Sequence, residues 1–112
     1  MKRINVLRIG VDGEIEQVEI PAYVEDYQRM VDGPFEIGGY IEAVGDYDEF
    51  LLAIVNEDGI PRCLPKNENA SKLLGYTVLG DVFLVLDGED DFEDFPSEQE
   101  QYIRKIIEEE ST

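Results

Sequence analysis

Two segments at the start of the chain alternate between apolar and polar residues. Residues 3–9 are rich in β-branched side chains, and residues 14–20 place acids on one face and aliphatic side chains roughly on the other. A period of two predicts half-buried strands. Asp12-Gly13, between the two segments, is a turn signal typical of hairpins. The sequence therefore predicts an N-terminal β-hairpin.

The apolar spacing then changes to that of a helix. Pro21 ends the second strand and suits the first turn of a helix. Residues 22–31 carry apolar side chains at helical spacing, which predicts a short amphipathic helix, and Asp32-Gly33-Pro34 ends it.

Two strands are predicted next. Residues 35–44 have strand character but contain Gly38-Gly39, and glycines inside a strand indicate a bulge or a close backbone approach. Residues 50–55 are a continuous apolar run, which favours a central strand buried on both faces.

The pattern is weaker in the next part of the chain. Residues 60–64 predict a strand that is short or lies at an edge, because Pro61 cannot donate a backbone hydrogen bond. Residues 65–75 predict a loop with one helical turn around 70–74, and residues 76–86 predict the last strand.

The C-terminal part begins with an acidic connector at residues 87–95. A helix over residues 97–110 is predicted to follow, with Ser97 and Glu100 in the positions of a capping box. We expect one domain spanning residues 1–112, of α+β class. Its sheet would be small and mostly antiparallel, with about five to six strands, a short helix after the first hairpin and a C-terminal helix.

The charge is the unusual property of the composition. The chain has 27 acids, nine bases and a formal net charge of −18. This charge argues against direct binding of nucleic acid or of an anionic membrane. No segment reaches the roughly 20 apolar residues of a membrane-spanning helix, and the N-terminus lacks the pattern of a secretory signal. With one cysteine and therefore no internal disulfide, we expect a cytoplasmic protein, inside the host cell if a phage encodes it.

An ordered set of short motifs runs from Gly38 to Leu86. It comprises Gly38-Gly39-Tyr40-Ile41-Glu42, Val55-Asn56-Glu57-Asp58-Gly59, Leu64-Pro65-Lys66-Asn67-Glu68-Asn69-Ala70 and Leu79-Gly80-Asp81-Val82-Phe83-Leu84-Val85. With these motifs the chain, over about residues 4–86, resembles the family called domain of unknown function 3846. The resemblance implies a setting in phages, plasmids and conjugative elements, where proteins that disarm host defence are frequent, and it implies no activity.

The residue types exclude several kinds of chemistry. Histidine is absent, which removes Ser-His-Asp and Cys-His catalysis and the usual zinc sites. Cys63 has no activating partner, so we expect it to be a small core or edge residue. Neither residues 46–48 nor residues 87–91 match the calcium loop of an EF-hand. We expect no enzyme activity, no cofactor and no metal site.

The main hypothesis concerns the acidic segments. Residues 24–58 contain ten acids and one base, and residues 87–112 contain eleven acids and two bases, whereas residues 60–80 are nearly neutral. Rows of fixed carboxylates can mimic a nucleic-acid backbone, which predicts an inhibitor that binds a basic nucleic-acid-binding host protein, such as a restriction or CRISPR effector. Phe92, with Phe95 and Tyr102, would add apolar anchors. The predicted partner-binding residues are Asp46, Asp48, Glu49, Glu89, Asp90, Asp91, Phe92, Glu93 and Asp94.

Two other interpretations remain open. A small-ligand module could sequester a nucleotide immune signal in a pocket formed by Gly38, Gly39, Tyr40, Asn56 and Asn67. The two asparagines also fit ordinary turn chemistry. In the third interpretation the acidity only keeps a housekeeping domain soluble in high salt. The sequence does not predict an oligomeric state.

Overall fold

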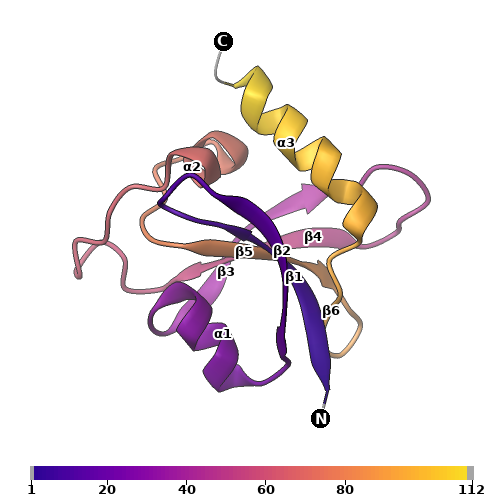
Figure 1. Cartoon of the computed structure of the whole chain (residues 1–112), viewed down its shortest axis with the longest axis horizontal. Helices are drawn as coiled ribbons and strands as arrows, with labels where there is room; N and C mark the ends of the chain where they lie inside the picture. The colour runs from indigo at the N-terminus through magenta and orange to yellow at the C-terminus, as the bar shows by residue number, and fades with distance from the viewer. Residues whose placement is uncertain (1, 111–112) are drawn as a thin grey trace.

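The protein is described here by a computed structural model covering residues 2–110, so the outermost residues of the predicted domain, 1 and 111–112, lie outside the described residues. A six-stranded antiparallel sheet has the order β2-β1-β5-β4-β3, and β6 also pairs with β5 (Figure 1). The strands are β1 (Arg3–Ile9), β2 (Ile15–Pro21), β3 (Phe35–Glu42), β4 (Phe50–Asn56), β5 (Val82–Asp87) and β6 (Phe92–Glu93). The helices are α1 (Val24–Val31), α2 (Glu68–Leu74), the 3-10 turn η1 (Ser97–Gln99) and α3 (Glu100–Glu109). The predicted α+β class is confirmed.

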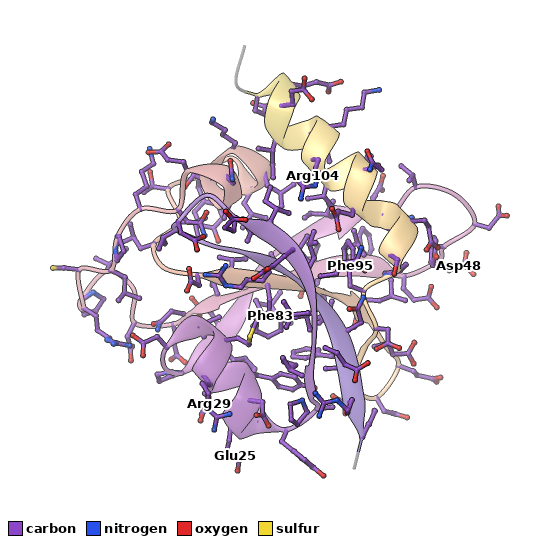
Figure 2. All side chains as sticks on the ribbon, in the orientation of Figure 1. Glu25, Arg29, Asp48, Phe83, Phe95 and Arg104 are labelled. Carbon is purple, nitrogen blue, oxygen red and sulfur yellow. The ribbon has the colours of Figure 1, made fainter. Side chains whose placement is uncertain are left out.

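The sheet is covered on both faces. Helix α1 lies on one face, and α2 and α3 lie on the other (Figure 1). Strands β4 and β5 lie between these layers, and every residue from Leu51 to Asn56 is buried. This double burial explains the continuous apolar run of β4, because a strand with one wet face would alternate. In Figure 2, Phe83 and Phe95 lie inside the fold.

The predicted hairpin and bulge are both present. Strands β1 and β2 pair from Arg3 opposite Pro21 to Ile9 opposite Ile15. Gly13 has a φ of 88°, which glycine adopts without steric cost. The register of β3 against β4 shifts between Ile37 and Gly39, as the glycine pair predicts.

Strand β1 does not follow β5 along its whole length. It pairs with β5 over Leu7 to Ile9, and beyond that point β6 takes its place beside β5. The backbone N–H of Phe95 donates to the carbonyl of Asn5 at 2.8 Å. The segment predicted as a connector is therefore held between β1 and β5 at this end of the sheet.

The prediction of a strand at residues 60–64 is wrong. This segment forms turns, in which the N–H of Leu64 donates to the carbonyl of Gly59. Cys63 has a φ of 53° and is exposed, so it is neither a core residue nor part of an edge strand. Strand β4 already has a neighbour on each side, which leaves no position beside it for a further strand.

Three other boundaries differ from the prediction. Helix α2 is longer than one turn and begins after Asn67, whose side chain caps it. Strand β5 begins only at Val82, because Gly80 with a φ of 88° interrupts the extended backbone. The predicted capping box does not form, since α3 has no side-chain cap and the Glu100 carboxylate contacts Gln17 and Arg104 instead.

Within residues 2–110, no helix has both the length and the apolar character that crossing a membrane requires.

Candidate binding surface

Two acidic segments begin at the same end of the sheet. Leu51 of β4 lies opposite Leu86 of β5, so the loop that precedes β4 and the segment that follows β5 start from neighbouring strands. We call residues 43–49 and 88–94 together the acidic end. It contains all eight predicted partner-binding acids, and each of them is exposed. They are Asp46, Asp48, Glu49, Glu89, Asp90, Asp91, Glu93 and Asp94.

The 43–49 loop is tied to the start of α3. The buried side chain of Gln99 accepts a hydrogen bond from the N–H of Val44 at 3.0 Å and donates to the carbonyl of the same residue at 2.9 Å. The hydroxyl of Tyr47 donates to the carboxylate of Glu98. These contacts fix the backbone of the loop, while its acids project outward, as Figure 2 shows for Asp48.

Contacts hold the C-terminal half of the 88–94 segment. The Asp94 carboxylate accepts from the N–H of Asn5 at 2.7 Å, and the Asp91 carboxylate accepts from the N–H of Phe92 at 2.7 Å. The ring of Phe92 packs on Tyr27, with centroids 5.2 Å apart. The structure therefore presents the acids of this segment from an ordered backbone.

The predicted aromatic anchors have other positions. Phe95 is 1% exposed, so the expectation that it contacts a partner is wrong. Tyr102 is half-buried against the core beneath α3. Phe92 is half-buried and packs against the core beneath α1, and this contact anchors the acidic segment to the fold.

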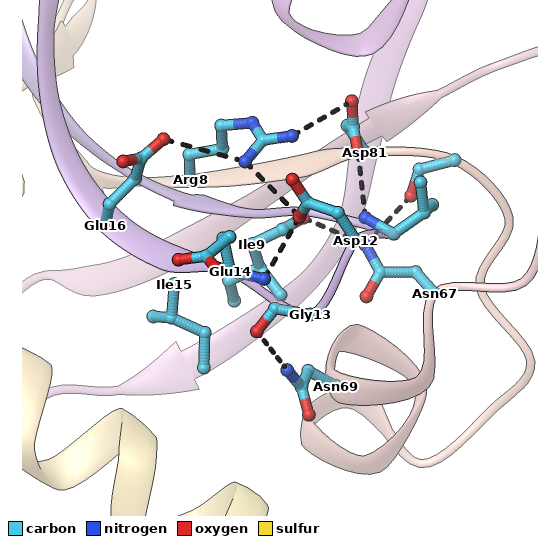
Figure 3. Close-up of polar contacts among 12 residues, drawn as sticks. Arg8, Ile9, Asp12, Gly13, Glu14, Ile15, Glu16, Asn67, Asn69 and Asp81 are labelled. Atoms are coloured by element: carbon cyan, nitrogen blue, oxygen red, sulfur yellow. Dashed lines mark hydrogen bonds and ion pairs between the residues drawn. The ribbon is translucent and has the colours of Figure 1, made fainter.

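Ion pairing differs between the two ends of the sheet. Within residues 2–110, one ion pair reaches the eight acids, from Lys2 to Asp91 at 3.7 Å between exposed side chains. At the opposite end, Arg8 lies 3.6 Å from each of Asp12, Glu16 and Asp81 (Figure 3). Two further pairs at that end join Arg62 to Asp32 and Lys66 to Glu68. The negative charge of the acidic end is therefore largely uncompensated within the fold.

The contact between Tyr47 and Glu98 shifts the pKa of both side chains. The hydrogen bond from the Tyr47 hydroxyl lowers the pKa of the Glu98 carboxyl below its ordinary value of 4.5. The same bond, with a smaller effect of desolvation, raises the pKa of the Tyr47 phenol above 10.0. Both shifts keep the pair in its bonded form, phenol with carboxylate, over a wide pH range.

An exposed apolar patch beside these acids was missed from the sequence. Ile37, Tyr40 and Phe50 are 43%, 62% and 42% exposed. Ile37 and Tyr40 lie opposite Ile54 and Leu52, both of which belong to the core beneath α1, so the patch lies on that face of the sheet. Alternation along β3 could have revealed it, had the bulge at Gly38-Gly39 been used to set the register.

Acid-lined hollows flank this patch on two sides. One, of about 320 Å³, is bordered by Ile37, Leu52 and residues 87–92. The other, of about 230 Å³, is bordered by Phe50 together with Glu42, Tyr47 and Glu49. The apolar patch and the acidic end thus form one continuous surface.

The five residues of the predicted ligand pocket do not line one pocket. The Asn67 side chain is completely buried, donates to the carbonyls of Ile9 and Gly80, and accepts from the N–H of Ala70. Asn56 donates to the carbonyls of Val31 and Asp32 and accepts from the N–H of Asp58. The turn chemistry expected as the alternative role of both asparagines is what the structure shows.

The other three members of the predicted pocket lie on different faces of β3. A Cβ on Gly38 would meet Val55 at 2.7 Å, and one on Gly39 would meet Leu74 at 2.8 Å, so both glycines admit close packing within the fold. Tyr40 points to the opposite face. A hollow of about 190 Å³ near Asn56 is lined by other residues, including Ile60, Tyr76 and Leu79.

Within the described residues, no group of three or more acids or cysteines is arranged to hold a metal ion.

The comparisons with known proteins place the chain in one family. The family model described as Domain of unknown function (DUF3846) matches residues 1–108. No curated protein and no solved structure matches the chain. The match covers nearly the whole sequence and includes the motifs between Gly38 and Leu86, so this chain belongs to the DUF3846 family.

Proposed function

We propose that the protein is a non-enzymatic inhibitor that uses its acidic end to occupy the nucleic-acid-binding surface of a basic protein. The observation that carries this proposal is the position of two acidic segments at the same end of the sheet, on neighbouring strands, with one ion pair among their eight carboxylates in the described chain. A basic groove would supply the positive charge that the fold itself does not.

The charge density suits mimicry of nucleic acid. The longest extent of the protein is 35 Å. Duplex DNA of that length carries about 20 phosphate charges, at one charge per ~1.7 Å of axis. The net charge of the protein is −18. The whole protein therefore carries a net charge similar to that of a DNA segment of its own length, and eight of its 27 acids lie at the acidic end.

The rigidity of the surface also favours binding. A flexible acidic tail loses conformational entropy when it binds, whereas the acids of 43–49 and 88–94 are already held by Gln99, Asn5 and Phe92. Preorganised charge of this kind accelerates association and selects for a complementary basic surface.

The expected targets are host defence proteins that bind DNA or RNA, such as restriction or CRISPR effectors in the cytoplasm of a bacterial host. This part of the proposal is supported by the setting that the resemblance implies, since the family is common in phages, plasmids and conjugative elements, where proteins that disarm host defence are frequent. The chemistry alone specifies a basic, nucleic-acid-binding partner.

The proposal is tested by binding of a purified effector to two triple variants of equal charge change. The acidic-loop variant carries Asp46→Asn, Asp48→Asn and Glu49→Gln. The control variant carries Glu14→Gln, Glu57→Gln and Glu108→Gln, three exposed acids outside the acidic end. We expect the acidic-loop variant to lose at least about tenfold in affinity for the effector and the control variant to lose much less. Salt screens the attraction between the effector and acids that lie outside the interface, whereas acids in contact with the effector are screened less.

Salt and competition complete the test. Affinity for the effector should fall at least about tenfold between roughly 50 and 300 mM salt, and the protein should displace the effector's own DNA or RNA. The mimicry mechanism is refuted if the affinity does not depend on salt concentration, or if the two triple variants lose equal affinity.

A further inference from the structure

Strand β3 is an open edge of the sheet. It pairs with β4 on one side, and no other strand of the described chain pairs with it. One side-chain contact reaches its backbone in the described residues, from the Tyr76 hydroxyl to the carbonyl of Gly38 at 2.7 Å. The remaining outward N–H and C=O groups of β3 are therefore available to another strand.

At the opposite edge of the sheet, formed by β2, arginine side chains occupy backbone carbonyls. On β2, the Arg104 guanidinium donates to the carbonyl of Ile15 at 2.6 Å, and the Arg3 guanidinium donates to the carbonyl of Glu19 at 3.3 Å. Charged side chains that occupy edge carbonyls hinder the addition of a strand. One edge of the sheet is thus occupied by charged side chains, whereas β3 carries one bulge, between Ile37 and Gly39, and is unpaired on its outer side in the described chain.

The open edge carries apolar side chains that an added strand would cover. Tyr40 of β3 and Phe50 of β4 pack edge to face, with centroids 6.1 Å apart and an interplanar angle of 81°. Ile37 lies on the same face. Aromatic side chains at the centre of such a patch are the usual source of binding energy in an interface.

Charge around the patch determines which strand would fit. The hollow beside Ile37 is bordered by Asp87, Glu89 and Asp90, and the hollow beside Phe50 is bordered by Glu42, Asp48 and Glu49. Asp91 also borders the hollow beside Ile37 and is paired with Lys2, and no ion pair reaches the other six carboxylates in the described chain. An added strand that alternates apolar residues with lysine or arginine would set its apolar side chains on the patch and its cations beside the acids.

A second copy of this chain is a poor occupant. Two β3 strands paired antiparallel about their middle would bring Glu36 of one copy near Glu42 of the other, which are like charges on directly opposite positions. Each copy also carries a net charge of −18, so association is opposed over the whole surface.

We propose that β3 binds an extended, basic segment of the partner protein as an additional strand of the sheet. This inference rests on the proposed function in one respect, that the partner is basic. The added strand would fix the orientation of the complex through backbone hydrogen bonds, and the acidic end would then lie against the nucleic-acid-binding surface of the partner.

The test uses peptides selected from a random twelve-residue library against the full chain at about 50 mM salt. We expect the selected peptides to alternate basic and apolar residues and to shift the backbone amide signals of residues 37–42 in NMR spectra. Methylation of the peptide nitrogens on one set of alternate residues should reduce affinity at least tenfold, since it removes the donors that face β3. Methylation of the other set should change affinity little.

Protein variants provide the matched control. Tyr40→Ala should reduce peptide affinity at least tenfold, and Tyr23→Ala, which removes a tyrosine that is 49% exposed next to α1, should leave it unchanged. The inference is overturned if no peptide is enriched, if both methylated forms bind normally, or if the shifted amides lie outside β3. It is also overturned if light scattering shows that the chain dimerises and Tyr40→Ala abolishes the dimer.

The two proposals fail in different ways. If peptides bind β3 as described but the protein does not compete with nucleic acid for the effector, the proposed function fails and strand addition stands. If the acidic-loop variant loses effector binding while Tyr40→Ala keeps it, the proposed function stands and strand addition fails.

Discussion

Replacing Asn67 by alanine removes three hydrogen bonds from the centre of the fold. The Asn67 amide donates to the carbonyls of Ile9 and Gly80, at 2.9 Å each, and its oxygen accepts from the N–H of Ala70 at 3.0 Å. The side chain therefore joins β1, the start of β5 and the first turn of α2. All four residues are buried, so water does not replace the lost partners.

The size of the loss follows from the groups that are left unpaired. Each buried carbonyl without a partner costs about 1 kcal/mol at the lower end of the usual range, and loss of a helix N-cap costs about 1 kcal/mol. The expected decrease in the free energy of unfolding is therefore about 3 kcal/mol, a large part of the 5–15 kcal/mol typical of a domain. The melting temperature should fall by roughly 10–20 °C.

The measurement is urea unfolding followed by circular dichroism, with Asn69→Ala as the matched control. Asn69 is the neighbouring asparagine of α2, and it makes one longer contact, to the carbonyl of Gly13 at 3.3 Å (Figure 3). Its loss should cost less than about 0.5 kcal/mol. If Asn67→Ala costs less than about 1 kcal/mol, or no more than Asn69→Ala, the structural role assigned to Asn67 is wrong.

Three further predictions concern packing, pH and charge. Gly38→Ala should destabilise the fold by about 1–3 kcal/mol in urea unfolding, because its Cβ would lie 2.7 Å from Val55 and 2.8 Å from the Tyr76 hydroxyl; stability equal to that of the parent would contradict the packing at the bulge. Glu98→Gln should lower stability most at neutral pH. Because the folded-state pKa of Glu98 is lowered, the stabilisation that its carboxylate gives is present above pH 4.5 and is lost as the pH falls through the folded-state pKa. A difference in stability between variant and parent that does not shrink in acid would refute the Tyr47–Glu98 bond. The acidic-loop variant should melt at a higher temperature than the parent at about 20 mM salt, and the gap should narrow at about 500 mM, because salt screens the repulsion that the substitutions remove; a variant that melts lower would show that these acids stabilise the fold.

Local signals in the sequence predicted the parts of the fold that depend on neighbouring residues. Asp12-Gly13 predicts the hairpin because the turn conformation is encoded where it occurs, and Gly38-Gly39 predicts the bulge for the same reason. Residues 60–64 show the limit of such signals. Their composition suits a strand, but the backbone of this segment closes turns on itself, with hydrogen bonds from Arg62, Cys63 and Leu64 to Asp58, Ile60 and Gly59.

The candidate surface depends on pairing that no local pattern contains. The acids of 43–49 and of 88–94 are recognisable in the sequence, but their position at the same end of the sheet follows from the pairing of β4 with β5. The position of Phe95 is decided in the same way. An aromatic residue in an acidic segment suggests an exposed anchor, yet its backbone pairs with Asn5 and its ring enters the core.

The distribution of charge bears on whether the acidity serves binding or only solubility. Solubility requires net charge but no particular arrangement of it, and acids next to bases would cost the fold less repulsion. In this protein Arg8 faces three acids at one end of the sheet, while eight acids at the other end share one exposed pair with Lys2. The acidic end thus carries repulsion that the fold does not relieve, beside an apolar patch and an open strand edge that solubility does not require. If neutralising a surface stabilises the protein and abolishes binding, that surface is maintained for its partner. The acidic-loop variant allows stability and binding to be measured in the same molecule.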